Sequence, residues 1–445
     1  MSDFFSLLHP KMLRFSMALF ISTMGSNGIA EENALVVDEA LIRPLIQESL
    51  EKHPSLQAIR FRIEAAQSSI RALRLWEDPE LSLGIVSAEE EKRRDDGDIF
   101  LGIDQPLPRL KLHHAEKNIR EIEFKAQKAL QSIVENEIGL AVAKSALELA
   151  LADDVLRLQK QEIQWMETLV GVAKERAKNP NVSIVESLRL ESELAIRFQK
   201  LEAAQRRRTQ LAFTLNLLLG RDAEMSWPLL TLPSTTIINP QTLFDENTFS
   251  REKLLARLNQ ENPLLQSLQL QIAIVEAQAE ASRAMRQPIF MLGLDSKAYS
   301  GGNFREAMLK IKMSLPWINR AVYDAELSRF LAESRAAQGT LSAQTNKLVT
   351  ELSSLWIEAK NQRLLEKAYA QKVLPKTEKT AESVQNAWTS NKASLLEVLE
   401  ARNTLLEVRK EQKRAVAAEQ SAMQSISALL GRFTGERELG KTFSK

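Results

Sequence analysis

The side chains that could perform chemistry are few, and their spacing matches no catalytic set. His113 and His114 are adjacent. Consecutive helical positions diverge by about 100°, so the two rings cannot share one metal ion. Asp153 and Asp154 are adjacent carboxylates without a histidine, glycine-rich loop or nucleophile motif nearby. Phosphate-loop, dinucleotide-binding and Gly-x-Ser-x-Gly patterns are absent. We therefore expect a protein that is not an enzyme and has no catalytic residues, metal site or cofactor.

Charged segments favour solvated surface over a binding site. Arg206, Arg207 and Arg208 lie among Glu and Gln in an amphipathic pattern, which favours a solvent-exposed helix face. Residues 89–98 mix acidic and basic side chains and are expected to form a water-exposed loop. The 59 basic and 58 acidic residues leave a net charge of +1, which gives no general attraction for nucleic acid. The absence of Cys excludes disulfides and cysteine metal sites.

The N-terminus has the pattern of a secretory signal. An apolar run of ten residues, 15–24, follows Lys11 and Arg14 and precedes several small residues. A membrane-spanning helix needs about 20 apolar residues, so the run is too short to be one. We expect residues 1–30 to be a signal peptide cleaved between Ala30 and Glu31; Met1 and Met12 both remain open as the start of translation.

The rest of the chain is an internal duplication. Five short matches recur in the same order at shifts of 208 to 211 residues, beginning with HPSL at 53–56 and NPLL at 262–265 and ending with LLGR at 218–221 and 429–432. We expect a first repeat at 31–221, a linker at 222–244, a second repeat at 245–432 and a tail at 433–445.

Each repeat contains a strand hairpin. Alternating apolar residues predict strands at about 80–87 and 98–105, and at about 289–297 and 304–314. In the last strand Lys310 and Lys312 alternate with Leu309, Ile311 and Met313. Strands of about nine residues have the length of tilted membrane strands, although a soluble hairpin with one wet face would give the same pattern.

Long helices follow each hairpin. Only 15 Gly and 14 Pro occur in 445 residues, and no Pro lies between Pro108 and Pro180. A heptad seam predicts one helix over 110–177. Turns are expected at 179–181 and 390–392, followed by capping boxes at Ser183 with Glu186 and Ser394 with Glu397. Pro375 is expected to kink its helix.

This combination requires several chains. Four strands cannot close a barrel, and open strand edges are not stable in lipid. Long helical hairpins likewise need neighbours for their apolar seams. If the strands span a membrane, several chains must share one barrel, and three chains would provide twelve strands.

The order of the motifs resembles the TolC-like outer-membrane efflux factors. It runs through HPSL, PELSLG, FLGIDQPLP, a long helix, NPNVSIVESLRLE and LLGR, and is then repeated. Residues 373–403 are similar to the second-repeat tip of that family, and residues 315–327 are similar to its heavy-metal or cation efflux branch. The resemblance covers about 33–435. It departs from the family at the tips, where Asn391 stands in place of Gly.

The resemblance implies both fold and function. The fold would be mainly α with a membrane part: a homotrimer with a twelve-stranded β-barrel over a twelve-helix α-barrel, and an equatorial belt. The protein would be the outer-membrane exit duct of a tripartite efflux pump, with a long periplasmic part and no nucleic acid partner. It would conduct substrate passively, with metal cations as a candidate cargo. Its partners would be outer-membrane lipid, a periplasmic adaptor and an inner-membrane transporter of the resistance-nodulation-division type.

Two groups of residues are expected to serve this function. The tips would contact the adaptor, and strand alternation would direct two lysines into the barrel lumen. The expected tip residues are Asn179, Pro180, Asn181, Val182, Ser183, Ser390, Asn391, Lys392, Ala393 and Ser394, and the expected lumen residues are Lys310 and Lys312. A periplasmic coiled-coil adaptor or structural protein, and the outer-membrane duct of a type I secretion system, remain the alternatives.

Overall fold

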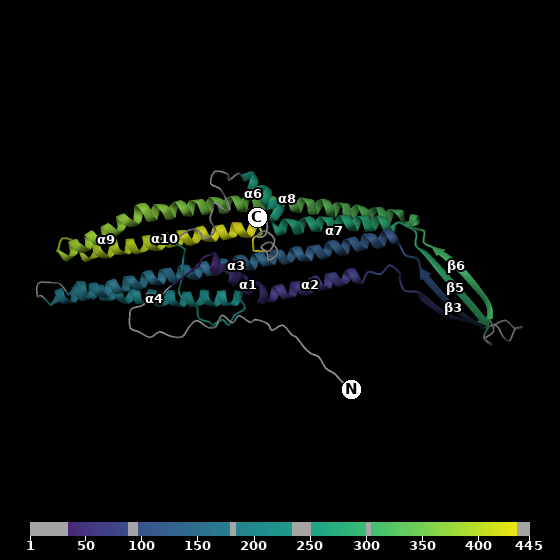
Figure 1. The fold of residues 1–445 in the computed structure, drawn as a ribbon, viewed down its shortest axis with the longest axis horizontal. Coiled ribbons are helices and arrows are strands. Elements are labelled where there is room, and N and C mark those ends of the chain that lie inside the picture. The colour runs from purple at the N-terminus through teal and green to yellow at the C-terminus, as the bar shows by residue number, and fades with distance from the viewer. Residues whose placement is uncertain (1–33, 88–96, 179–183, 234–250, 300–303, 434–445) are drawn as a thin grey trace, which may run out of the picture.

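The computed structural model describes residues 34–87, 97–178, 184–233, 251–299 and 304–433. The expected cleavage site at Ala30 and Glu31, the expected loop at 89–96 and the first tip at 179–183 lie outside these residues. The molecule is elongated, with a strand sheet at one end and two helical hairpin tips at the other (Figure 1). None of the described helices is both long enough and apolar enough to cross a bilayer.

The two halves contain equivalent elements. The first comprises α1 (Glu39–Lys52), α2 (Pro54–Arg71), β2 (Glu80–Ser87), β3 (Gly97–Pro106), α3 (Leu110–Ala177) and α4 (Val185–Leu218). The second comprises α6 (Arg251–Glu261), α7 (Pro263–Met285), β5 (Phe290–Tyr299), β6 (Phe304–Met313), the 3₁₀ turn η1 (Pro316–Asn319), α8 (Arg320–Ala368), the π-helix η2 (Tyr369–Val373), α9 (Leu374–Thr389) and α10 (Leu395–Leu429). Short strands β1 (Leu35–Val36) and β4 (Leu230–Thr231) pair in parallel beside the helices.

The matched sequence motifs have the same structural role in each half. His53 and Asn262 are N-caps, each followed by a Pro in the first helical turn. Gly220 and Gly431 follow the ends of α4 and α10 with φ of 64° and 67°, a left-handed conformation that closes a helix C-terminus. The repeated LLGR motif is therefore a helix stop.

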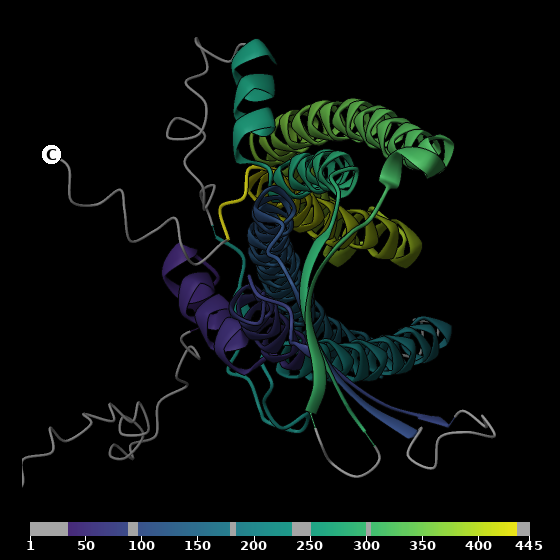
Figure 2. The ribbon, with the colours of Figure 1, turned by 90° about the vertical axis from the view of Figure 1, so that its right-hand side faces the viewer.

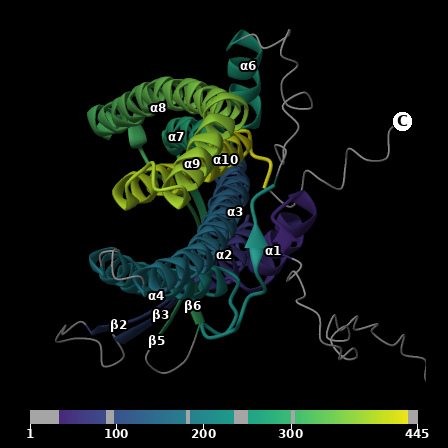
Figure 3. The same ribbon diagram turned by 90° about the vertical axis from the view of Figure 1, so that its left-hand side faces the viewer.

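The helices form one curved layer. In the half that carries the tips, the order is α4, α3, α10 and then α8 with its continuation α9, because α3 packs on α4 and α10, and α10 packs on α8 and α9. In the other half the order is α2, α3, α7 and α8. The layer is an open arc whose free edges are α8 on one side and α4 with α2 on the other (Figures 2 and 3). No partner within the described chain covers those edges.

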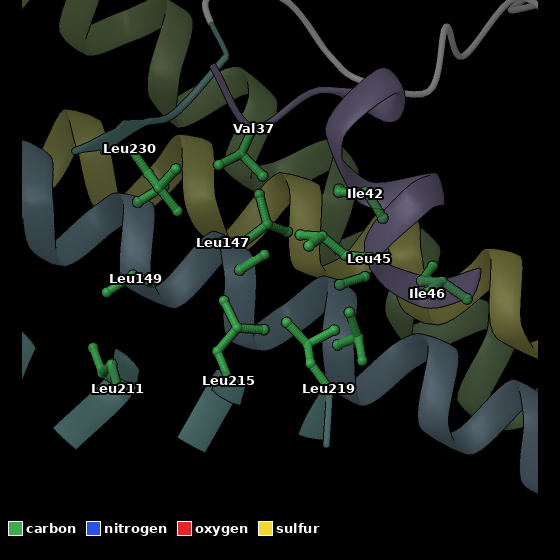
Figure 4. Packing of buried hydrophobic residues seen from close by; sticks show 14 of the residues in the cluster. Val37, Ile42, Leu45, Ile46, Leu147, Leu149, Leu211, Leu215, Leu219 and Leu230 are labelled. Atoms are coloured by element: carbon green, nitrogen blue, oxygen red, sulfur yellow. The ribbon is translucent and has the colours of Figure 1, made fainter. Parts of the chain in front are cut away.

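Helix α3 is the backbone of this layer. Its 68 residues confirm the single helix expected from the heptad seam and extend about 100 Å at 1.5 Å per residue. The seam positions, in steps of four and three, are Ile138, Val142, Ser145, Leu149, Ala152, Leu156, Gln159, Ile163, Met166, Val170 and Ala173. All of them are buried except Ala152 and Gln159, which are partly buried. At its middle, Leu147 and Leu149 meet Val37, Leu215 and Leu230, so that α1, α4 and the β1–β4 pair converge on one core (Figure 4).

Two local predictions have clear outcomes. Ser394 and Glu397 form the expected capping box at the start of α10. Pro375 does disturb its helix, but as a π-helical turn over Tyr369–Val373 directly before α9. Proline lacks an N–H and its ring clashes with the carbonyl four residues earlier, and a widened turn accommodates both.

An ion pair holds α1 against the end of α4. Glu48 accepts from Arg221 Nη2 at 2.5 Å and from Lys52 Nζ at 2.8 Å. The hydrogen bond from Arg221 is the main reason that the pKa of Glu48 falls to about 2. Arg221 in turn lies over the Trp227 ring, 5.0 Å from its centroid.

The lowered pKa predicts an acid-sensitive contribution to stability. The ionised Glu48 stabilises the fold above its unfolded pKa near 4.5, and this contribution is lost as the pH falls towards 2. We expect Glu48→Gln to lower the free energy of unfolding by about 2 kcal/mol at pH 7, with the difference from wild type shrinking below pH 4. Thermal unfolding in detergent measures this. Glu51→Gln, exposed on the same helix, is the control, and a pH-independent effect of Glu48→Gln would contradict the prediction.

Candidate functional site

The four long strands form an antiparallel sheet in the order β2, β3, β5, β6. The central pair, β3 with β5, joins the two repeats, and β2 and β6 are the edges. One face of the sheet is apolar and bare: twelve side chains are between 41% and 83% exposed. They are Leu81, Leu83, Ile85, Ile99, Leu101, Ile103, Phe290, Leu292, Leu294, Leu309, Ile311 and Met313. An apolar surface of this extent indicates a membrane or protein contact.

The opposite face carries a cluster of charges. Lys310 Nζ lies 2.5 Å from Asp295 Oδ1 and 3.2 Å from Asp104 Oδ1. Lys312 Nζ lies 2.7 Å from Asp104 Oδ2. Asp104 comes from the first repeat and the other three residues from the second, so the cluster ties the repeats together across the β3–β5 pair.

Glycine makes room for this cluster. Gly293 stands between Asp104 and Lys310 in the register of the sheet. A Cβ at Gly293 would overlap Asp104 Oδ1 and the Lys310 stem. Gly102 likewise leaves space in which Ser82 and Asp295 approach its backbone. Lys310 of β6 can therefore reach across β5 to the carboxylate of Asp104 on β3.

The expected lumen residues Lys310 and Lys312 thus lie on the polar face, and both are ion-paired. Their partners Asp104 and Asp295 were not among the residues expected from the sequence. Strand alternation could have put both aspartates on the polar face, but their proximity to the lysines depends on the β3–β5 register.

The second tip is built from two helix ends. Asn391 has φ of 56° and follows α9, with Lys392 N–H donating to Ala387 O at 2.7 Å and Asn391 N–H to Trp388 O at 3.0 Å. These two bonds form a Schellman motif, in which Asn can replace Gly because it tolerates the left-handed conformation. Ser390, Asn391, Lys392 and Ser394 are exposed and Ala393 is half-buried.

A cation and an aromatic ring join the two tips. Arg176, near the end of α3, donates to the backbone carbonyls of Trp388 and Thr389 at 3.3 and 2.6 Å. Its guanidinium lies 4.3 Å from the centroid of the Trp388 ring, which is 2% exposed. A cation at a helix C-terminus is favourable, so the first hairpin caps a helix of the second.

A buried ionic network joins the hairpins farther from the tips. Glu162 of α3 pairs with Arg197 of α4 at 3.2 Å and with Arg402 of α10 at 2.8 Å. Arg402 lies over the Trp165 ring, whose Nε1 donates to Gln385 of α9 at 3.1 Å. Burial raises the pKa of Glu162 although both guanidinium groups favour its ionised form.

The adjacent aspartates are structural. Asp153 accepts from Arg208 Nε at 2.5 Å and from Leu230 N–H at 2.8 Å. Asp154 pairs with Arg157 and Lys413, each at 3.1 Å, and accepts from Thr231. The two carboxylates therefore hold β4 against α3.

The same contacts correct one expectation. Arg206 and Arg207 are exposed as a solvated face requires, but Arg208 is not, because it is bound by the buried Asp153 and by the carbonyls of Trp227 and Pro228. His113 and His114 stack edge to face at 6.1 Å. Within the described ranges, no three His, Asp or Glu side chains are grouped as a metal ion would require.

The comparisons with known proteins agree with this architecture. Residues 45–221 match the model of the outer membrane efflux protein family. This match confirms the resemblance noted in the sequence for that part of the chain.

Solved structures of outer membrane channels share the fold over both halves. CusC, described for its transmembrane channel formation, superposes with a TM-score of 0.74 at 16% identity, covering 89% of this chain and 93% of its own. VceC of Vibrio cholerae gives 0.71 at 17% identity, covering 88% and 96%. The open-state MtrE channel of Neisseria gonorrhoeae gives 0.69 at 13% identity, covering 91% and 93%. No curated protein sequence matches the chain.

Gly293 and Gly84, at equivalent positions of the two repeats, give a matched pair of variants. Gly293→Ala should separate Lys310 from Asp104 and lower the free energy of unfolding by about 1.5–3 kcal/mol, the usual value for a hydrogen bond to a charged group. Gly84→Ala places a Cβ at ordinary distance from Phe100, 3.6 Å, and should be neutral. Denaturation of the purified proteins in detergent, followed by circular dichroism, measures both. Equal effects of the two substitutions would contradict the role of Gly293.

Proposed function

We propose that this protein is the outer-membrane exit duct of a tripartite efflux pump. Three copies would place their sheets edge to edge in a twelve-stranded barrel, and their helices in a twelve-helix tube that reaches across the periplasm. Substrate would pass through passively. The observation that carries this proposal is the sheet, which is apolar and bare on one face, charged on the other, and open at both edges.

The open edges support ring formation. Both the sheet and the helical layer end in unlike edges, β2 against β6 and α4 with α2 against α8. Contact between unlike edges of identical chains is heterologous, and it closes into a ring when the rotation from one copy to the next is a whole fraction of a turn. Exposed apolar side chains lie on both helical edges, among them Phe213 and Leu217 on α4 and Ile357 and Leu364 on α8.

Two exposed tryptophans where the strands join the helices support a membrane surface at this end of the sheet. Trp76 precedes β2 and Trp317 follows β6, and they are 54% and 57% exposed. Tryptophan favours the interface between lipid and water, and aromatic residues flank the apolar band of membrane barrels. A soluble periplasmic adaptor, the alternative from the sequence, would have no reason to expose these rings beside a bare apolar sheet face.

The partners proposed are a periplasmic adaptor and, through it, an inner-membrane transporter of the resistance-nodulation-division type. The adaptor would bind the tips at residues 179–183 and 390–394, where Ser390, Asn391 and Lys392 are exposed. Metal cations are the proposed cargo, supported by the similarity of residues 315–327 to the heavy-metal efflux branch. A secreted polypeptide is the cargo if the genomic neighbours encode a type I secretion system.

Membrane fractionation tests the duct. We expect the protein in the outer-membrane fraction as a trimer that dissociates only on heating before electrophoresis. Ile311→Arg, on the bare face of the edge strand β6, should reduce insertion, because a lipid-facing arginine costs up to about 2–4 kcal/mol at the bilayer midplane. Release of wild-type protein with the soluble periplasm would refute the proposal and favour an adaptor.

Cysteine crosslinking tests the tips, and the chain contains no native Cys to interfere. Cys introduced at Asn391 or Asn181 should form adducts with an adaptor in intact cells. Cys introduced at Arg62 is the control, because this residue is exposed on α2, in the half of the helical layer that does not carry the tips. If the tip variants give no more adduct than Arg62→Cys, the tips do not contact the adaptor.

A further inference from the structure

The contact between the two repeats of one chain is a template for the contact between two copies. Within the chain, β3 of the first repeat pairs antiparallel with β5 of the second, and Asp104 stands opposite Gly293. In the duplication, β6 is the equivalent of β3, and β2 is the equivalent of β5. Both β6 and β2 are free edges of the sheet. A copy that places its β2 beside β6 therefore repeats a pairing that the chain already makes.

The shifts between the repeats give the register of this second pairing. The Leu-Pro pairs that follow β3 and β6 are 208 residues apart, and this shift carries Asp104 to Lys312. The prolines that precede β2 and β5 are 209 residues apart, and this shift carries Gly293 back to Gly84. The β3–β5 register, transferred by these shifts, puts Lys312 of one copy opposite Gly84 of the next.

The transferred register also gives the stagger that a closed barrel needs. Within one chain, Lys310 shares a row with Glu80 at the far edge of the sheet. At the seam it stands opposite Val86 of the next copy, which is six residues farther along β2. Three such seams displace the rows by three times six, or 18, residues around twelve strands. At about 3.3 Å per residue and about 4.8 Å between strands, this displacement tilts the strands by about 45°, as closed barrels require. A flat seam, with Lys310 opposite Glu80, would give no tilt.

The six-residue displacement is even, so each face of the sheet continues across the seam. On the bare face, Ile311 stands opposite Ile85, and Met313 opposite Leu83, of the next copy. All four side chains are exposed in the single chain. Apolar cross-strand pairs of this kind stabilise a sheet. A seam displaced by an odd number of residues would instead bring the charged face of one copy beside the bare face of the next.

The helical layer leaves the same relation open. Helix α7 packs on both α3 and α8, and it buries Ala277 and Ala281. The shift of 209 carries these two residues to Ser68 and Ala72 of α2, which are both exposed. Helix α2 packs on α3, but among the described elements no second long helix packs along it. The α8 edge of a neighbouring copy would supply one, as α3 does for α7.

We propose that β2 of one copy docks on β6 of the next in the transferred register, with Gly84 opposite Lys312. The inference rests on the proposed function, in which three copies form the ring. It adds what the sheet of one chain does not fix, which is the stagger at each seam and, through it, the tilt of the strands in the barrel.

Disulfide formation between copies tests the register, and the chain contains no native Cys. Residues directly opposite in an antiparallel pair have Cα atoms about 4.5–5.5 Å apart, which a disulfide spans. Within one chain, β2 and β6 are separated by two strands, so Cys introduced on these strands cannot pair there. The double variant Gly84→Cys/Lys312→Cys should therefore form covalent trimers in mildly oxidised membranes, seen by electrophoresis after boiling without reductant. Each single variant should form none.

A matched double variant tests the flat seam. Glu80→Cys/Lys310→Cys also places one Cys on each edge strand and both on the polar face. In the proposed register the two positions are about 20 Å out of step, because six residues separate them along the strand, and they should form no covalent trimer. More crosslinking of this variant than of Gly84→Cys/Lys312→Cys would overturn the proposed register.

The remaining outcomes separate this inference from the proposed function. If Gly84→Cys/Lys312→Cys does not assemble, Leu83→Cys/Met313→Cys tests the same register on the bare face. Heat-sensitive trimers that neither of these variants crosslinks would overturn the register and leave the duct intact. Wild-type protein that is not trimeric would instead count against the proposed function.

Discussion

The structure depends on one constraint: a chain of this shape cannot cover its own apolar surface. Twelve large side chains stand bare on one face of a four-stranded sheet, and both edges of that sheet are open. The helical layer repeats the problem, because its arc ends in α8 and α4 without a partner among the described residues. Burial of apolar surface is the main favourable term in folding, so both surfaces must be completed by lipid and by other copies.

Charged contacts between the repeats keep the two halves of one chain aligned before lipid and other copies cover the apolar surfaces. They occur at several levels along the molecule: Lys312 with Asp104 in the sheet, Lys413 with Asp154 near the middle, and Arg402 with Glu162 towards the tips. Buried ion pairs add little net stability because desolvation opposes their attraction, but breaking one is costly. Such pairs disfavour a slip of one repeat against the other, which in a strand would turn the apolar face inward.

Some of this could be predicted because the signals are local. The heptad seam of α3 and the capping box at Ser394 depend on residues a few positions apart, and each formed as its pattern indicates. Arg208 was assigned wrongly because its neighbours in sequence are polar, whereas its partner Asp153 lies 55 residues away. The left-handed Asn391 at the tip explains how the chain departs from glycine there without losing the turn.

The sequence by itself determined the helices, the strands and the division into two repeats, because each follows from a regular spacing of residue types. A repeat of 3.5 residues made long packed helices, alternation made strands with one apolar face, and the duplication made two similar halves. Only the tertiary structure decided which charges meet. Lys312 and Asp104 are 208 residues apart, and Glu162 and Arg402 are 240 apart. An ion pair requires a distance of a few ångströms, and that distance is fixed by the packing of one repeat against the other and by strand register, which no local pattern contains. The ion pairs of the polar face therefore emerged only in three dimensions.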